Sequence, residues 1–123
     1  MGIKVEDVVK NLESIIRYVE EQAEKGGFYL LLAETLMVKG TSLDFLGELD
    51  ASLKCHHKAL SICREHDYFF LEASILGGLA IANHQKNQYQ QALHYYFLSI
   101  EKHTFFGHQK AIAIHKCNVG SIY

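Results

Sequence analysis

The chain has 123 residues, of which 49% are hydrophobic and 21% charged, so it can form one folded domain with a core. A net charge of −2 and the lack of any Lys/Arg cluster argue against nucleic acid and against an anionic membrane surface as partners. Proline is absent, where average usage would give roughly six, and this favours long uninterrupted helices.

We identify no targeting or membrane signal in the sequence. The longest apolar run, residues 28–33, is far shorter than the ~20 residues of a membrane span. Residues 1–7 are acidic, where a secretion signal would be basic and then apolar. Three cysteines without regular spacing indicate reduced thiols. We therefore expect a cytoplasmic protein.

Residues 3–25 have the spacing of an amphipathic helix. Apolar side chains recur in steps of three and four along one stripe, namely Ile3, Val5, Val8, Val9, Leu12, Ile15, Ile16, Val19 and Ala23. Gly26-Gly27 follows the stripe, and glycine readily adopts the left-handed conformation that closes helices. The sequence predicts an N-terminal helix within residues 1–26.

The remainder of the chain repeats itself every forty residues. Residues that match across this period include the small residues Gly40, Ala80 and Gly120, and the pairs Leu36/Leu76, Leu53/Leu93 and His56/Tyr96. A fixed period in this range indicates stacked supersecondary units. Within each unit the spacing is helical: Ser52, His56, Ala59, Leu60 and Cys63 share one face, as do Ala92, Tyr96, Ser99, Ile100 and His103.

Each repeating unit is predicted to be a pair of antiparallel helices. Small residues in both helices allow a close approach, and short polar turns at residues 47–48 and 86–88 separate the two helices of a pair. We expect the units to be joined around residues 65–67 and 103–104. The aromatic pairs 69–70 and 105–106 are expected to pack these junctions, because aromatic side chains dominate core burial.

The second unit resembles the tetratricopeptide repeat. The stretch Leu76-Gly77-Gly78-Leu79-Ala80, followed by Ala92-Leu93 and Tyr96, is similar to that family's pattern of large apolar, small and aromatic positions. Residues 119–123 are similar to the opening of a third unit. The forty-residue period exceeds the family's usual 34 and is similar to the long-helix variant of bacterial regulatory proteins and cargo adaptors.

The resemblance implies an all-α fold, in which antiparallel helix pairs stack as a right-handed α-solenoid with an extra N-terminal helix. The whole chain, residues 1–123, is expected to be one domain. It divides into the N-terminal helix (1–26), a degenerate repeat (28–66), a repeat (68–104) and an incomplete repeat or capping helix (107–123). A stack needs a terminal cap. We expect a longer protein to continue the third unit, although the last helix could itself be the cap, or two chains could cover each other there.

No constellation in the sequence favours catalysis or a metal site. Cys63 and His66 share a helix face, but no second ligand pair is evident for zinc. His115 and Cys117 are two residues apart on a helix and therefore point in different directions. We expect neither an enzyme nor a bound metal or cofactor.

The resemblance places a binding groove on the first helix of each unit. Register points to Glu34 and, as candidate binding residues, to Met37, Thr41, Asp44, Phe45, Ser74, Gly77, Ile81, His84, Gln85, Ile114, Cys117 and Ser121. Family members that hold a peptide's terminal carboxylate use Lys and Asn at set positions. Here Gly77 and Ile81 occupy two of these positions, and only Asn118 matches the family's pattern. We therefore expect the groove to bind an apolar or amphipathic segment rather than a terminal carboxylate.

Three functions remain open at this point. The favoured one is a non-catalytic protein- or peptide-binding module, the N-terminal part of a cytoplasmic regulatory or scaffold protein. The alternatives are a peptide-sensing input domain of a bacterial signalling protein and a self-assembly module that forms a homodimer through residues 108–123.

Overall fold

In the computed structural model, residues 2–123 are described, the side chain of Glu24 excepted, and these residues form six α-helices and no strand. The predicted all-α fold is confirmed. The helices are α1 (Val5–Gly26), α2 (Tyr29–Phe45), α3 (Leu49–Glu65), α4 (Phe69–Gln85), α5 (Tyr89–Phe106) and α6 (Gln109–Ile122).

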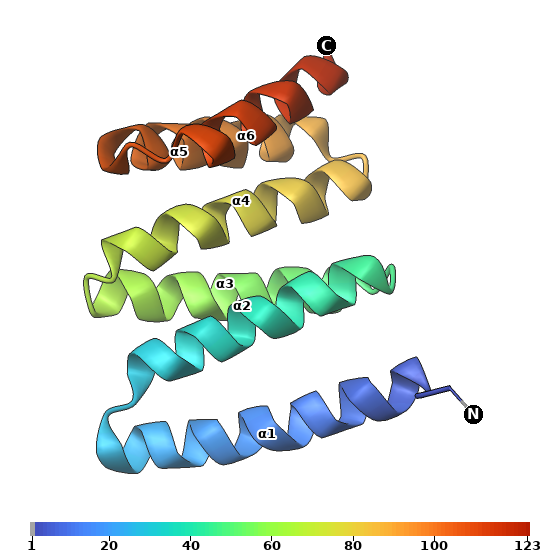
Figure 1. Cartoon of the computed structure of the whole chain (residues 1–123), viewed down its shortest axis with the longest axis vertical. Coiled ribbons are helices and arrows are strands. Elements are labelled where there is room, and N and C mark those ends of the chain that lie inside the picture. Colours follow the sequence, from blue (N-terminus) through green and yellow to red (C-terminus); the bar gives the residue numbers. More distant parts are fainter. Residues whose placement is uncertain (1) are drawn as a thin grey trace.

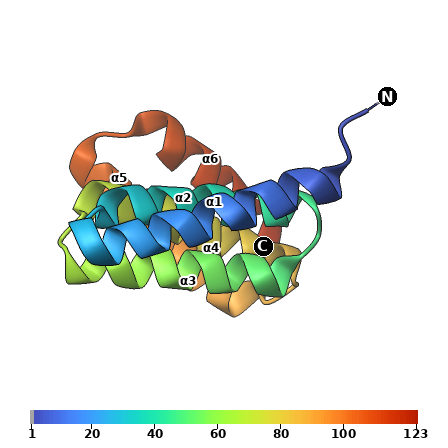
Figure 2. The same cartoon turned by 90° about the horizontal axis from the view of Figure 1, so that it is seen from below.

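The helices form an elongated stack in which neighbours in sequence are neighbours in space (Figure 1). The pairs α2/α3 and α4/α5 pack closely, α3 contacts α4, and α2 also contacts α4. Viewed from the α1 end, α3 lies on one side of the stack and α6 on the other (Figure 2). Adjacent helices therefore pack pairwise in a solenoid-like arrangement. None of the helices within residues 2–123 combines the length and apolar character needed to cross a bilayer.

One type of turn ends each of the helices α2 to α5. In each turn a residue adopts a left-handed conformation: Gly47 (φ 76°), Asp67 (58°), Asn87 (62°) and Gly107 (71°). The next residue donates its backbone N–H to the carbonyl five residues earlier, as in Tyr68 N–H to Cys63 O at 2.9 Å. This is the Schellman closure, which satisfies carbonyls that the helix end would leave unpaired.

These turns recur every twenty residues, which is half of the period predicted from sequence. Left-handed residues lie at 47, 67, 87 and 107. The same spacing extends to Gly27 (φ 75°), which ends α1. The expected junction at residues 103–104 is wrong. The helix α5 continues to Phe106, and Gly107 is the residue that adopts the left-handed conformation ending it. Glycine adopts this conformation without the Cβ penalty, and Asp and Asn tolerate it better than other residues.

The core runs along the stack as a continuous apolar seam. Its buried members from α1 to α4 are Ile16, Ala23, Leu32, Ala33, Leu36, Ala59, Leu60, Cys63, Ile75, Leu76 and Leu79. A second cluster of Ala80, Ala92 and Tyr96 continues the core between α4 and α5. The residues predicted to share one face of α3 and one face of α5 are thus buried, except that Ile100 of α5 is half-buried.

The helix α1 packs against α2 at the N-terminal end of the stack and is the amphipathic helix that the sequence predicts. Its residues Ile16 and Ala23 are buried in the core, whereas Val5 and Ile15 remain exposed. An ion pair fastens it to α3, with Lys58 Nζ 2.6 Å from Glu20 Oε1. Because both side chains are partly solvated, this pair contributes less than apolar burial does.

Small residues allow His56 of α3 to lie between α2 and α4. A methyl group added at Gly78 would lie 2.6 Å from His56 Cε1, and one added at Gly40 would lie 2.7 Å from His56 Nε2. The imidazole is fully buried. Gly120, at the equivalent position to Gly40 in α6, has no such neighbour, because a Cβ there would meet nothing within 4 Å.

We expect Gly78→Ala and Gly120→Ala to change stability in opposite directions. Alanine at 120 should raise the free energy of unfolding by up to about 1 kcal/mol, since glycine is a poor helix former. Alanine at 78 must displace His56 and should lower it by about 1–3 kcal/mol. Urea unfolding followed by circular dichroism measures both. Equal stabilisation by the two changes would contradict the packing of His56.

Candidate functional site

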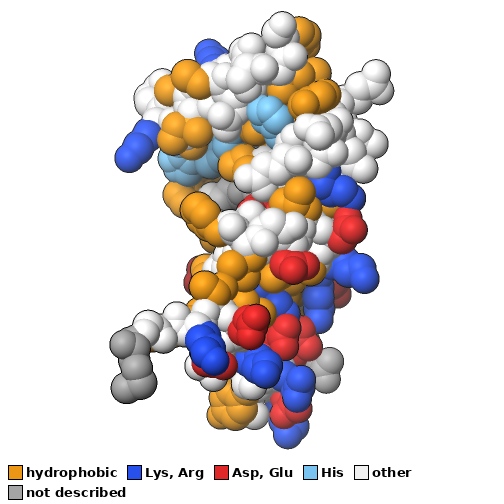
Figure 3. All heavy atoms as spheres, turned by 90° about the vertical axis from the view of Figure 1, so that its right-hand side faces the viewer, with side chains coloured by type: hydrophobic (Ala, Val, Ile, Leu, Met, Phe, Trp, Pro, Cys, Tyr) orange, Lys and Arg blue, Asp and Glu red, His pale blue; other side chains and the backbone are white. Residues whose placement is uncertain are grey.

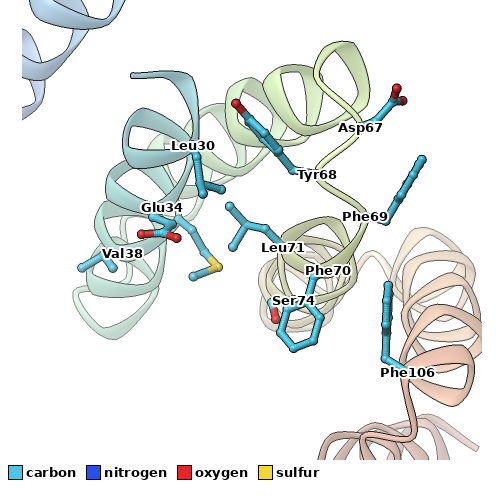
Figure 4. Close-up of a pocket in the computed structure, with 11 residues that line it drawn as sticks. Leu30, Glu34, Val38, Asp67, Tyr68, Phe69, Phe70, Leu71, Ser74 and Phe106 are labelled. Carbon is cyan, nitrogen blue, oxygen red and sulfur yellow. The ribbon is translucent and has the colours of Figure 1, made fainter. Parts of the chain in front are cut away.

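Three adjoining hollows follow the side of the stack formed by α2, α4 and α6. The largest, of about 740 Å³, lies between α2 and the start of α4 and is closed at one end by Phe106 of α5 (Figure 4). Apolar side chains supply most of its wall, and two carboxylates, Glu34 and Asp67, lie on opposite sides of it. We call this the wide hollow; its lining residues are Leu30, Glu34, Met37, Val38, Asp67, Tyr68, Phe69, Phe70, Leu71, Ser74 and Phe106.

The other two hollows continue from the wide hollow along α2 and α4. The middle hollow, of about 260 Å³, shares Met37 and Ser74 with it. The end hollow, of about 160 Å³, shares Thr41, Gly78 and Ile81 with the middle one. We call the three hollows together the trough. The middle hollow is lined further by His56, Gly77, Gly78, His103, Ala111, Ile114 and His115, and the end hollow by Asp44, Phe45, Gly78 and Gln85.

Most of the residues suggested by register lie along this trough. Those that line it are Glu34, Met37, Thr41, Asp44, Phe45, Ser74, Gly77, Ile81, Gln85 and Ile114. Three do not line it. His84 packs against Tyr89 and Tyr96 instead, Cys117 is exposed on α6, and Ser121 donates a hydrogen bond to the carbonyl of Asn118 at 2.7 Å.

The aromatic wall of the wide hollow was not among the expected site residues. The pairs 69–70 and 105–106 were expected to be buried at the junctions, but Phe69 is 57%, Phe70 61% and Phe105 84% exposed. The junction contact itself exists, because the rings of Phe70 and Phe106 lie 5.2 Å apart. Each pair lies at a helix end, and Phe69, Phe70 and Phe106, but not Phe105, line the wide hollow.

His103 of α5 lies beside two other histidines, His108 of the turn that follows and His115 of α6. His103 Nδ1 lies 2.8 Å from His108 Nδ1, and the rings of His103 and His115 are 5.7 Å apart. His103 and His115 are buried. Burial lowers the pKa of His103 below 6.5, and the charges of His115 and His108 lower it further; burial alone lowers the pKa of His115. The imidazoles of His103 and His115, which line the middle hollow, are therefore held in the uncharged form at neutral pH.

Tyr96 of α5 takes the position that His56 has in α3, as the forty-residue register predicts. Its phenol oxygen lies 3.1 Å from His84 Nδ1, and its ring is 5.6 Å from that of His115. Burial raises the pKa of Tyr96 to about 12, although a hydrogen bond with Asn118 acts in the opposite direction. The phenol is thus a neutral packing and hydrogen-bonding group between α4 and α6.

The cysteine and histidine pairs considered for chemistry are separated. Cys63 is buried in the core, where burial raises its pKa to about 11 and the nearby charge of Glu72 acts in the same direction, so it is a thiol rather than a thiolate. His66 stacks between Tyr29 and Tyr68. His115 is buried and Cys117 exposed, so they face different ways as expected. Over the described part of the chain, no three metal-binding side chains lie close enough to hold an ion.

No family model matches the chain, and no curated protein matches its sequence.

We expect stability to fall as the pH drops below about 6.5. The pKa values of His103 and His115 are lowered in the folded state, so the unfolded chain takes up protons first as the pH falls. The contribution of these two histidines to the free energy of unfolding is therefore complete above about pH 6.5 and is lost as the pH falls below it. Urea unfolding between about pH 8 and pH 5 tests this. The change His115→Gln should reduce the loss, whereas His94→Gln, on the exposed face of α5, should leave it unchanged. An identical pH profile for His115→Gln would contradict the assignment.

Proposed function

We propose that the chain is a non-catalytic protein-interaction module of the tetratricopeptide type, which binds a segment of a partner protein in the trough. The observation that carries this proposal is the continuity of the three hollows along α2, α4 and α6. A single pocket would suit a small ligand, whereas a row of adjoining hollows suits an extended or helical peptide whose successive side chains enter in turn.

The residues of the trough support binding rather than catalysis. Its walls carry apolar groups such as Met37, Ile81 and Ile114, and Phe45 at the far end is 89% exposed. Aromatic and methionine side chains are enriched in the cores of protein interfaces. His103 and His115 of the middle hollow are buried with lowered pKa values and are not positioned around a reacting centre.

The state of the cysteines supports a cytoplasmic module. Cys55, Cys63 and Cys117 are unpaired and lie in different environments, half-buried, buried and exposed. Unpaired thiols of this kind are usual in a reducing compartment.

Peptide selection with matched variants tests the proposal. A displayed library of random peptides is selected on the immobilised chain, and the affinity of the selected peptides is measured by fluorescence anisotropy. Ile81→Arg, at the junction of two hollows, should weaken binding at least about tenfold because it buries a charge against apolar walls. Phe97→Arg changes an equally apolar and 51% exposed side chain on α5 outside the trough, and should leave affinity unchanged.

Two results would contradict the proposal. Equal binding by both variants would place the peptide site elsewhere, and a failure to select any peptide would remove the support for a peptide groove. Thermal unfolding of each variant shows whether it is folded.

A further inference from the structure

The charges along the trough are all of one sign. Within the described residues, Glu34, Asp67 and Asp44 line the three hollows, and no Lys or Arg does so. The whole chain, in contrast, carries 12 Lys and Arg against 14 Asp and Glu. The single sign along the trough therefore reflects where the cations lie rather than an acidic composition.

Three lysines outside the trough are held in ion pairs, and one of them, Lys102, borders a further hollow that shares Phe69 and Phe106 with the wide hollow. Lys102 Nζ lies 3.0 Å from Glu72 Oε1, Lys58 pairs with Glu20, and Lys86 pairs with Asp50. The space-filling view shows charged side chains gathering over the α1 end, while hydrophobic and histidine side chains occupy more of the surface toward the other end (Figure 3).

The two accessible carboxylates lie at the wide hollow. Glu34 of α2 and Asp67 of the turn before α4 are exposed, and no ion pair forms at either among the described residues. They lie at opposite edges of the hollow (Figure 4): Glu34 is beside Val38 on α2, and Asp67 is beyond Tyr68 and Phe69, with its carboxylate directed outward from the apolar side chains. Asp44, in contrast, is largely enclosed and accepts a hydrogen bond from Ser52.

From this arrangement, which rests on the proposed function of the trough, we infer that the partner segment is basic and amphipathic: large apolar side chains enter the wide hollow, and flanking Lys or Arg residues pair with Glu34 and Asp67. The volume of about 740 Å³ accommodates more than one large side chain. Carboxylates beside aromatic faces attract cations in two ways, by charge and through the ring quadrupole. An acidic segment would meet like charges at both edges.

The inference is tested with three synthetic peptides that differ in charge alone. Each is labelled with fluorescein and carries Leu and Phe at the same helical spacing, with Lys, Gln or Glu at the remaining positions. Affinities are measured by anisotropy at low and high salt. We expect the Lys peptide to bind at least about tenfold more tightly than the Glu peptide at low salt, and salt to reduce this difference.

Charge variants then locate the effect. Glu34→Lys should weaken the Lys peptide about fivefold and strengthen the Glu peptide. Asp67→Asn removes the second charge but keeps a residue that tolerates the left-handed backbone there, as Asn87 does in the next turn. It should weaken the Lys peptide less than Glu34→Lys does. Glu21→Lys on α1 alters the net charge by the same amount as Glu34→Lys, and should have no effect.

Four outcomes would overturn the inference. If the three peptides bind equally and Ile81→Arg weakens all of them, the trough binds apolar segments without charge selection and the proposed function stands. If Glu21→Lys weakens the Lys peptide as much as Glu34→Lys does, the attraction is not local. If none of the three binds while library-selected peptides do, the chemistry of the partner is different. If light scattering shows a dimer that Phe70→Ser dissociates, a second copy covers the hollow.

Discussion

The closing hydrogen bond of each turn is the constraint on which the stack depends. It runs from the residue after the left-handed position to a carbonyl five residues earlier, at positions 48, 68, 88 and 108. That same residue accepts the first backbone bond of the next helix, as Tyr68 O does from the N–H of Glu72. One residue therefore ends one helix and begins the next. No further residue lies between it and the next helix, so the turn fixes the angle at which the two helices meet.

The constant turn explains where the trough lies. Because the connections are alike, alternate helices return to the same side, and α2 and α4 come into contact although α3 separates them in sequence. Side chains at the N-terminal ends of α2 and α4, such as Leu30 and Phe70, then face a common space at the level of the turns. His56 of α3 also reaches this side of the stack, because its side chain lies between α2 and α4 and lines the middle hollow.

Helix positions and the buried faces of α3 and α5 were accessible from sequence because both depend on local spacing. The inner face of α3 and the register of His56 with Tyr96 follow from a period of 3.6 residues and a repeat of forty, whereas the stripe of α1 is buried only in part. The shorter period was missed because the residues at its turns differ in kind, Gly at 47 and 107 but Asp at 67 and Asn at 87. The exposure of Phe69 and Phe70 was missed because a helix end carries no periodic signal for whether a neighbour covers it.

The twenty-residue spacing of the turns also has a consequence for how such a surface can change size. A helix pair spans forty residues and joins its neighbours through the same backbone geometry on either side, so a pair could be inserted or removed without disturbing the closure of the pairs that flank it. The length of the binding surface is then a matter of copy number, and the range of partner segments can be extended by duplication before any residue in an existing hollow is altered.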